Sequence, residues 1–164
     1  MTLPAGYAID PDLDLVLERE VDVPPELVWA AWTDPKHLVH WFTPAPWKTP
    51  IAELDVRPGG KFRTVMRGPE GQEFDNNGCF LDVVPNERLV WTTTMTHGFR
   101  PQSGAAPYHF TAMILMEPKG AGTLYRAIVA HGAAEAAKQH AERGFHDGWG
   151  KALDQLVAHM KSAG

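Results

Sequence analysis

The chain opens on a short alternating segment and then changes to helical spacing. Residues 14–23, DLVLEREVDV, alternate apolar and polar side chains, which predicts a strand with one wet face. Pro24 and Pro25 end this strand, and residues 27–32 then carry apolar side chains at helical spacing. The sequence Thr33-Asp34-Pro35 breaks this helix and predicts a second short helix with Asp34 as its N-cap.

The central part of the chain reads as strands separated by turns. Glycine, proline and asparagine clusters fall between segments rich in β-branched and aromatic residues. The predicted strands are residues 51–56, 61–67, 74–84, 88–95, 108–117 and 123–131. Such close spacing with turn linkers favours an antiparallel sheet.

The last part of the chain predicts one long helix, from about Ala133 to Ser162. Its second half has a broad apolar face, whereas Lys138 and Glu142 interrupt the same face in the first half. A helix and a sheet must bury their apolar faces against each other. We therefore expect an α+β fold in which the helix anchors on the sheet at one end and covers a cavity at the other.

Composition limits the classes of function. The chain has 164 residues, a formal net charge of -5 and no basic stripe, so we expect a single domain (1–164) that does not bind nucleic acid. No secretory signal and no membrane span of roughly 20 apolar residues is visible. The single cysteine, Cys79, favours a cytoplasmic location. Residues 1–12 carry little pattern and predict a loose N-terminal arm.

Five segments, spread over about residues 14–161, resemble a known superfamily. They are EREVDVPPELVWAAWTDPKHLVHWF, RPGGKFRTVMRGPEG, NGCFLDVVPNERLVWT, GTLYRAIVAHG and HAERGFHDGWGKALDQLVAHM. The chain is similar to the helix-grip (SRPBCC) superfamily of START lipid-binding domains, polyketide cyclases and the birch-pollen allergen. Within it, the chain most resembles bacterial proteins similar to the C-terminal domain of the activator of heat-shock-protein-90 ATPase. The resemblance implies a curved antiparallel sheet of about seven strands wrapped on the C-terminal helix, with a hydrophobic pocket between them. The two short helices after the first strand follow from the pattern described above.

Aromatic and sulfur-containing side chains are numerous enough to line such a pocket. Alternation along the strands places Phe62 with Met66, and Trp91 with its alternate neighbours, on the predicted inner face. The alternative is that these side chains fill the core and leave no cavity. The predicted ligand-binding residues are Trp41, Phe62, Met66, Trp91, Phe110, Tyr125, Glu142, Phe145, His146 and Trp149.

Glu142 and His146 are the candidate catalytic residues. They lie four positions apart, so on one helix they would meet above the cavity as an acid–base pair or as polar contacts for a ligand. The alternative is a solvated ion pair, or pairing of Glu142 with Lys138. His131 and His140 flank the start of the predicted helix and are interpreted as structural hydrogen-bonding residues.

The sequence predicts no metal and no cofactor. His37 and His40 are three apart, yet no third ligand is placed beside them by the sequence. No nucleophile or phosphate-loop motif is present. The segment 108–117 is apolar on both faces, which predicts either a homodimer contact or a covering loop on its outer side.

Three functions are compatible with these observations. The leading hypothesis is binding of a small hydrophobic or aromatic molecule between the sheet and the C-terminal helix. The second is a cyclase- or dehydratase-like enzyme that uses Glu142 and His146 for proton transfer. The third is a co-chaperone that stimulates a heat-shock ATPase, which is implied by the resemblance alone.

Overall fold

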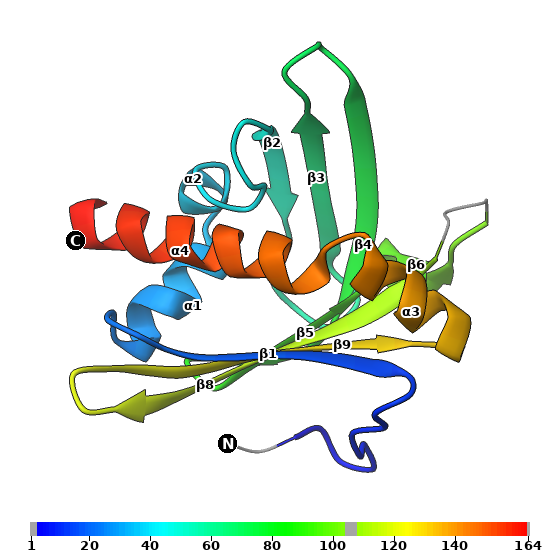
Figure 1. The fold of residues 1–164 in the computed structure, drawn as a ribbon, viewed down its shortest axis with the longest axis horizontal. Helices are drawn as coiled ribbons and strands as arrows, with labels where there is room; N and C mark the ends of the chain where they lie inside the picture. The colour runs from blue at the N-terminus through cyan, green and yellow to red at the C-terminus, as the bar shows by residue number, and fades with distance from the viewer. Residues whose placement is uncertain (1–2, 104–107, 164) are drawn as a thin grey trace.

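The computed structural model describes residues 3–103 and 108–163, and it confirms the predicted α+β helix-grip fold. One curved sheet wraps around a long C-terminal helix, and two short helices follow the first strand (Figure 1). The elements are β1 (Asp14–Val21), α1 (Pro25–Thr33), α2 (Pro35–Leu38), β2 (Lys48–Leu54), β3 (Lys61–Arg67), β4 (Glu73–Val84), β5 (Arg88–Thr92), β6 (Met95–Thr96), η1 (His97–Phe99), β7 (Arg100–Pro101), β8 (Phe110–Lys119), β9 (Gly122–His131), α3 (Ala134–Glu142) and α4 (Phe145–Ala163).

The main sheet is antiparallel throughout its described part. It has seven strands in the order β1-β9-β8-β5-β4-β3-β2, and β6 pairs with β7 in a separate two-stranded ribbon. The outer strands β2, β3 and β4 bend away from the floor that β1, β9 and β8 form, and α4 crosses the space between the two parts (Figure 1). This curvature is what creates room between the sheet and the helix.

Local sequence explains where the short helices begin. Pro25 occupies the first turn of α1, where its missing N–H costs nothing, and Glu26 lies at the positive end of the helix. The Asp34 side chain accepts a hydrogen bond of 2.9 Å from the backbone N–H of Lys36, which confirms the predicted cap of α2.

The predicted single C-terminal helix is wrong, because the segment forms two helices. α3 ends at Glu142 and α4 begins at Phe145. Gly144 has a φ of 90°, a left-handed conformation that glycine adopts without a steric penalty and that commonly ends a helix. The spacing argument that put Glu142 and His146 on one face therefore fails at Gly144.

The core lies mainly between the inner face of the sheet and helices α1, α2 and α4. Its fully buried side chains include Trp32, Leu38, Phe80, Leu153 and Leu156. These residues come from the apolar face of α1, from the second half of α4 and from the centre of the sheet. The packed end of α4 matches the clean apolar stripe that the sequence predicts there.

A second, smaller apolar cluster covers the outer face of the sheet. Val90, Met113, Leu115 and Ile128 are its buried members, and Leu3 and Tyr7 of the N-terminal arm pack against them. The Tyr7 hydroxyl also donates a hydrogen bond to the Asp14 carboxylate. Leu3 and Tyr7 therefore cover part of the apolar outer face, in the place where the sequence predicted a covering loop or a homodimer contact. The observation that suggested a homodimer contact is thereby accounted for within one chain.

Candidate functional site

A cavity of about 960 Å³ lies between the inner face of the sheet and the helices. Its walls come from β3, β4, β5, β8 and β9 on one side and from α1, the segment after α2, α3 and α4 on the other. Its volume is at the upper end of the range of about 300–1,000 Å³ that is typical of small-molecule sites. The predicted ligand-binding residues that line this cavity are Trp41, Phe62, Met66, Trp91, Phe110, Tyr125, Phe145 and Trp149.

Three aromatic rings in the cavity wall lie almost parallel. The ring centroids of Phe62 and Trp91 are 4.6 Å apart with an interplanar angle of 7°. The rings of Trp91 and Trp149 are 6.3 Å apart at 5°. Phe62 and Trp91 are nearly fully buried and stack on each other, so among these three rings the half-buried Trp149 offers the most surface to a molecule in the cavity.

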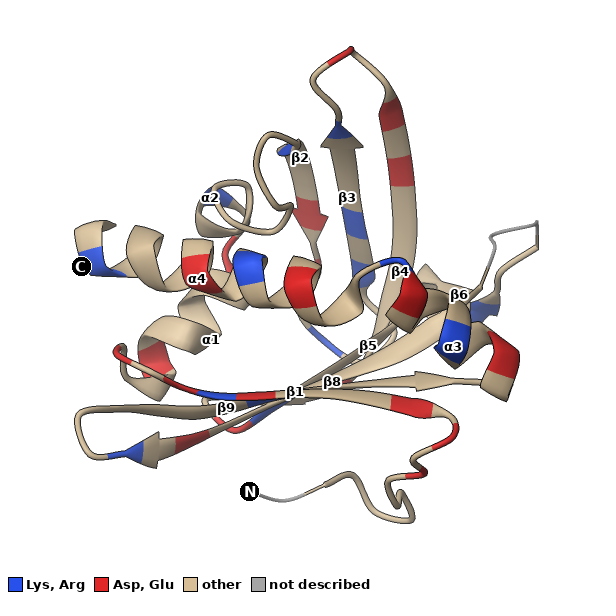
Figure 2. Cartoon of the chain, in the orientation of Figure 1, with Lys and Arg blue, Asp and Glu red and all other residues tan. Residues whose placement is uncertain are grey.

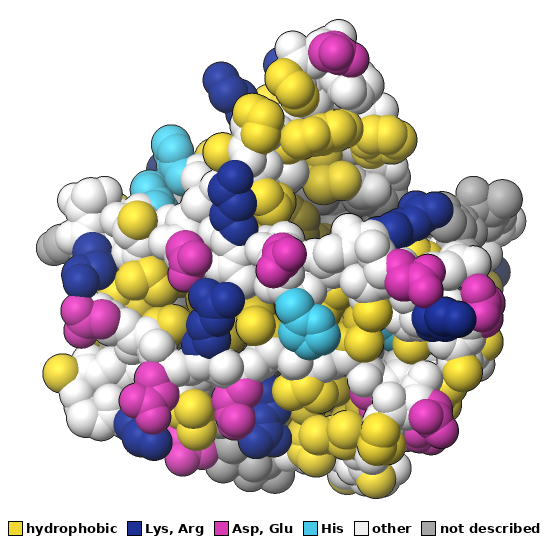
Figure 3. Space-filling model, in the orientation of Figure 1, with side chains coloured by type: hydrophobic (Ala, Val, Ile, Leu, Met, Phe, Trp, Pro, Cys, Tyr) yellow, Lys and Arg dark blue, Asp and Glu magenta, His cyan; other side chains and the backbone are white. Residues whose placement is uncertain are grey.

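The aromatic surface extends outward along the strands that rise beyond α4. Phe74 of β4 is 53% exposed, and its ring stacks on that of Trp47 at 5.8 Å. Hydrophobic side chains gather on this part of the molecule, above α4 (Figure 3). Phe74 also lines the cavity, so the apolar lining continues to the surface.

Tyr125 provides a polar group in the cavity wall. Its hydroxyl oxygen accepts a hydrogen bond of 3.2 Å from the indole N–H of Trp32, and burial raises the pKa of the Tyr125 hydroxyl. The phenol therefore keeps its proton. A tyrosine in this state offers a hydrogen-bond donor to whatever occupies the cavity.

Two buried polar atoms of the cavity wall have no hydrogen-bond partner among the described residues. They are Nε1 of Trp91 and Nε2 of His109. A buried polar group without a partner costs about 1–3 kcal/mol, so such atoms are rare and each needs an explanation, a bound molecule being one. Sequence reasoning placed Trp91 on the inner face but gave no sign that its N–H would be unpaired.

The most polar part of the wall is a pair of histidines that the sequence did not bring together. Nε2 of His131, at the end of β9, lies 2.9 Å from Nδ1 of His140 in α3. Both side chains are buried, and His140 lines the cavity. Burial, His131 and then Arg143 lower the pKa of His140 to about 4. The structural role expected for these histidines is confirmed, and His140 acquires a place at the cavity.

Glu142 and His146 do not line the cavity. Both side chains are exposed, and Nε2 of His146 lies 3.2 Å from the backbone oxygen of Val16 on the near edge of the sheet. The break at Gly144 rotates α4 relative to α3, so the buried side chains at this point are His140 and Phe145. The predicted acid–base pair above the cavity is wrong for this physical reason.

A third histidine joins the pair that the sequence placed on the second short helix. Nδ1 of His37 lies 3.0 Å from Nε2 of His159, and the rings of His40 and His159 stack at 4.6 Å. Burial, followed by His40 and His37, lowers the pKa of His159. Within residues 3–103 and 108–163, however, no three side chains of ligand type are placed to hold a metal ion.

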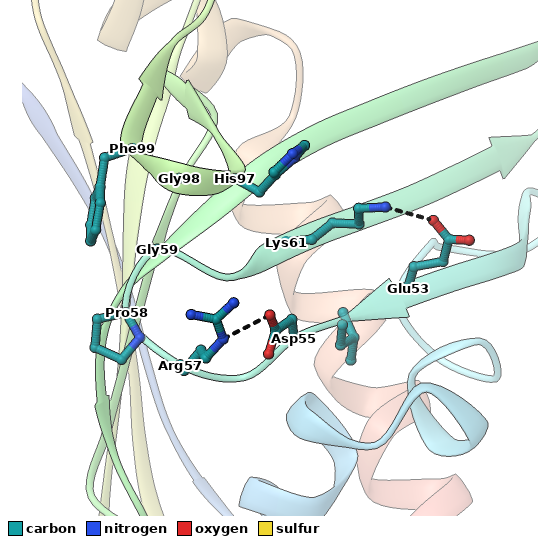
Figure 4. A pocket seen from close by; sticks show the side chains of 10 residues that line it. Glu53, Asp55, Arg57, Pro58, Gly59, Lys61, His97, Gly98 and Phe99 are labelled. Atoms are coloured by element: carbon teal, nitrogen blue, oxygen red, sulfur yellow. Dashed lines mark hydrogen bonds and ion pairs between the residues drawn. The ribbon is translucent and has the colours of Figure 1, made fainter.

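A smaller hollow of about 500 Å³ lies at the turn between β2 and β3, beside η1. Its charged side chains are occupied by each other, because Arg57 bonds Asp55 at 2.8 Å and Lys61 pairs with Glu53 at 3.5 Å (Figure 4). Similar pairs cross the outer faces of the strands, and basic residues are scattered over many elements (Figure 2). The polar cavity at the turn is therefore a weaker candidate than the aromatic one.

The fold and the cavity define a helix-grip protein, and comparisons with known proteins give the family. The family model described as "Activator of Hsp90 ATPase homolog 1-like protein" matches residues 22–161, so the chain belongs to this family. This result confirms the resemblance seen in the sequence. The comparison with curated proteins finds no match.

Solved structures share the whole fold. Protein NE0264 from Nitrosomonas europaea is 43% identical, with a TM-score of 0.90 over 94% of this chain and 98% of that one. The AHSA1 protein SPO3351 from Silicibacter pomeroyi is 26% identical, with a TM-score of 0.65 over 92% of this chain and 99% of the other. In the described part of the chain, no helix is long and apolar enough to cross a membrane.

Proposed function

We propose that this protein binds a small, flat and mostly apolar molecule in the cavity between the curved sheet and α4. The observation that supports this function best is a cavity of about 960 Å³ whose wall is rich in aromatic side chains, Trp91, Phe110 and Trp149 among them. Side chains that only filled a core would leave no cavity of this volume between the sheet and the helices. A few polar groups among aromatic walls are typical of ligand sites.

The other predicted functions have less support. An enzyme that uses Glu142 and His146 loses its geometric basis, since both side chains lie outside the cavity. A co-chaperone role rests on the family description and stays a prediction. The cytoplasmic location and the possible homodimer also stay predictions.

Filling the cavity from α4 tests the proposed function. Gly148 lines the cavity, and a Cβ built on it has no atom within 4 Å. The substitution Gly148→Leu therefore projects a side chain into free space without a backbone clash. Ala158→Leu is the matched control, because it places the same side chain on the exposed face of the same helix.

The measurement is a titration with Nile red, a neutral and flat dye whose fluorescence rises in apolar surroundings. We expect saturable one-to-one binding by the wild type and by Ala158→Leu, with an affinity lower by roughly tenfold or more in Gly148→Leu. Absence of saturable binding to the folded wild type would contradict the proposed function. Equal binding by all three proteins would place the dye elsewhere.

A further inference from the structure

The two buried histidines fix each other's protons. The Nδ1 atom of His131 lies 2.9 Å from the backbone oxygen of Leu13, and a carbonyl oxygen can only accept a hydrogen bond. Nδ1 of His131 therefore carries the proton. In the neutral ring, Nε2 of His131 then has only a lone pair to offer.

The constraint passes on to the second ring. Because Nε2 of His131 is an acceptor, Nδ1 of His140 at 2.9 Å must be the donor. The remaining nitrogen of neutral His140, Nε2, is then unprotonated. No hydrogen bond to this atom is made by the described residues, which leaves an acceptor in a residue of the cavity wall.

Aromatic contacts hold the imidazole of His140 in place. The ring of Tyr108 stacks on it with centroids 4.6 Å apart, and Phe110 and Phe145 lie at 5.2 and 5.3 Å. With the ring plane fixed by these contacts and by His131, the free lone pair has a fixed direction. A fixed acceptor beside aromatic walls selects for a donor on an otherwise apolar molecule.

We propose that the ligand is a hydroxylated aromatic molecule whose hydroxyl group donates a hydrogen bond to Nε2 of His140. This proposal rests on the proposed function, and it narrows the ligand from any flat apolar molecule to one with a hydroxyl group. The apolar ring contacts the aromatic wall at Trp149, and the hydroxyl contacts His140. Both residues line the same cavity.

The role of His140 is to accept a hydrogen bond and not to remove a proton. A pKa of about 4 makes the imidazole a weak base at neutral pH, far from the value near the working pH that general-base catalysis requires. The same low pKa keeps the ring neutral, and only the neutral ring has the free lone pair. Binding with orientation, without proton transfer, is the consequence.

A pair of probes that differ in one hydrogen-bond donor tests the proposal. 2-Naphthol and 2-methoxynaphthalene share the same ring system, but only the first has a hydroxyl proton. Each probe is titrated into the complex of the protein with Nile red, and displacement of the dye is followed by its fluorescence. We expect 2-naphthol to displace the dye from the wild type at roughly three- to tenfold lower concentration, the value of one net hydrogen bond.

Two substitutions test whether His140 causes the preference for 2-naphthol over 2-methoxynaphthalene. In His140→Phe the ratio between the two probes should fall to about one, since the aromatic contacts stay while the acceptor is lost. His146→Phe is the matched control, because the His146 side chain on α4 is exposed, and this variant should keep the wild-type ratio. If His140→Phe fails to fold, NMR of the ring nitrogens in labelled wild-type protein gives an independent answer, with Nδ1 of His140 protonated and Nε2 bare.

The outcomes separate this proposal from the proposed function. If Nile red and both probes fail to bind, the proposed function itself fails. If both probes displace the dye equally, or if NMR finds the proton on Nε2 of His140, the hydroxyl proposal is overturned while cavity binding stands.

Discussion

The two ends of α4 lie against the same sheet but differ in how tightly they pack. At the C-terminal end, Leu153, Leu156 and Met160 are buried in the continuous core. At the N-terminal end, the half-buried residues Gly148 and Trp149 line the cavity. The comparison teaches that the C-terminal turns of one helix can stabilise the fold while its N-terminal turns leave room for the proposed binding site.

The largest expected effect comes from truncating one side chain in the packed core and one beside the cavity. Leu156→Ala and Met66→Ala remove the same number of heavy atoms, but Leu156 is fully buried whereas Met66 of β3 borders the cavity. We expect Leu156→Ala to lower the free energy of unfolding by about 2–5 kcal/mol, the usual cost of a new cavity in a packed core. Met66→Ala should cost about 1 kcal/mol or less, because space already lies beside it.

Urea unfolding of both variants measures this difference. Similar losses of stability would mean that the wall around Met66 is as tightly packed as the core around Leu156, and the contrast between the two ends would disappear.

The pH dependence of stability gives the next largest effect, at the cavity end. The unfolded chain protonates His140 near its ordinary pKa of 6.5, whereas the folded protein does so only near 4. Between these values the unfolded state binds more protons, so acid destabilises the fold. We expect up to about 3 kcal/mol of stability that is complete above pH 6.5 and lost as the pH falls to about 4.

The free energy of unfolding is measured across this pH range for the wild type and His140→Phe. The difference between the two proteins gives the contribution of His140. His159 at the packed end has a pKa shifted in the same direction but is more exposed, so His159→Gln should change the pH profile less. An identical slope in the wild type and His140→Phe would show that His140 is not kept neutral by the fold.

The smallest effect distinguishes two glycines of α4. A Cβ at Gly148 has no atom within 4 Å, so Gly148→Ala should stabilise the helix by about 0.5–1 kcal/mol. A Cβ at Gly150 would lie 2.4 Å from Nη2 of Arg19, whose Nη1 donates a hydrogen bond to Asp154. Gly150→Ala should gain less, because Arg19 has to move. Thermal unfolding of the two variants compares them, and a greater gain for Gly150→Ala would contradict the assignment of free space to Gly148.

The sequence predicted the fold well because its signals are local. Alternation assigned Phe62, Met66 and Trp91 to the inner face, and capping and proline rules gave the start of the short helices. The order of elements and the resemblance then fixed the architecture that the structure confirms. Eight predicted ligand-binding side chains line the cavity, and five of them lie on strands, whose faces follow from a period of two: Phe62, Met66, Trp91, Phe110 and Tyr125.

The polar part of the site escaped prediction because it depends on contacts between distant elements. The pair of His131 and His140 forms only when α3 folds back on the end of β9, and no spacing rule anticipates it. One signal was available: Arg143-Gly144 is a typical helix end, with a basic residue before a glycine. Reading it would have separated Glu142 from His146 and directed attention to His140.

The most direct test of the cavity is to detect a molecule that the protein binds from a cell extract. Native mass spectra of wild type and Gly148→Leu, each exposed to the same cell extract, are compared with the denatured spectra. We predict an additional mass on the wild type that is lost on denaturation and is absent from Gly148→Leu. An additional mass of equal abundance on both proteins would contradict the claim that this cavity is the binding site.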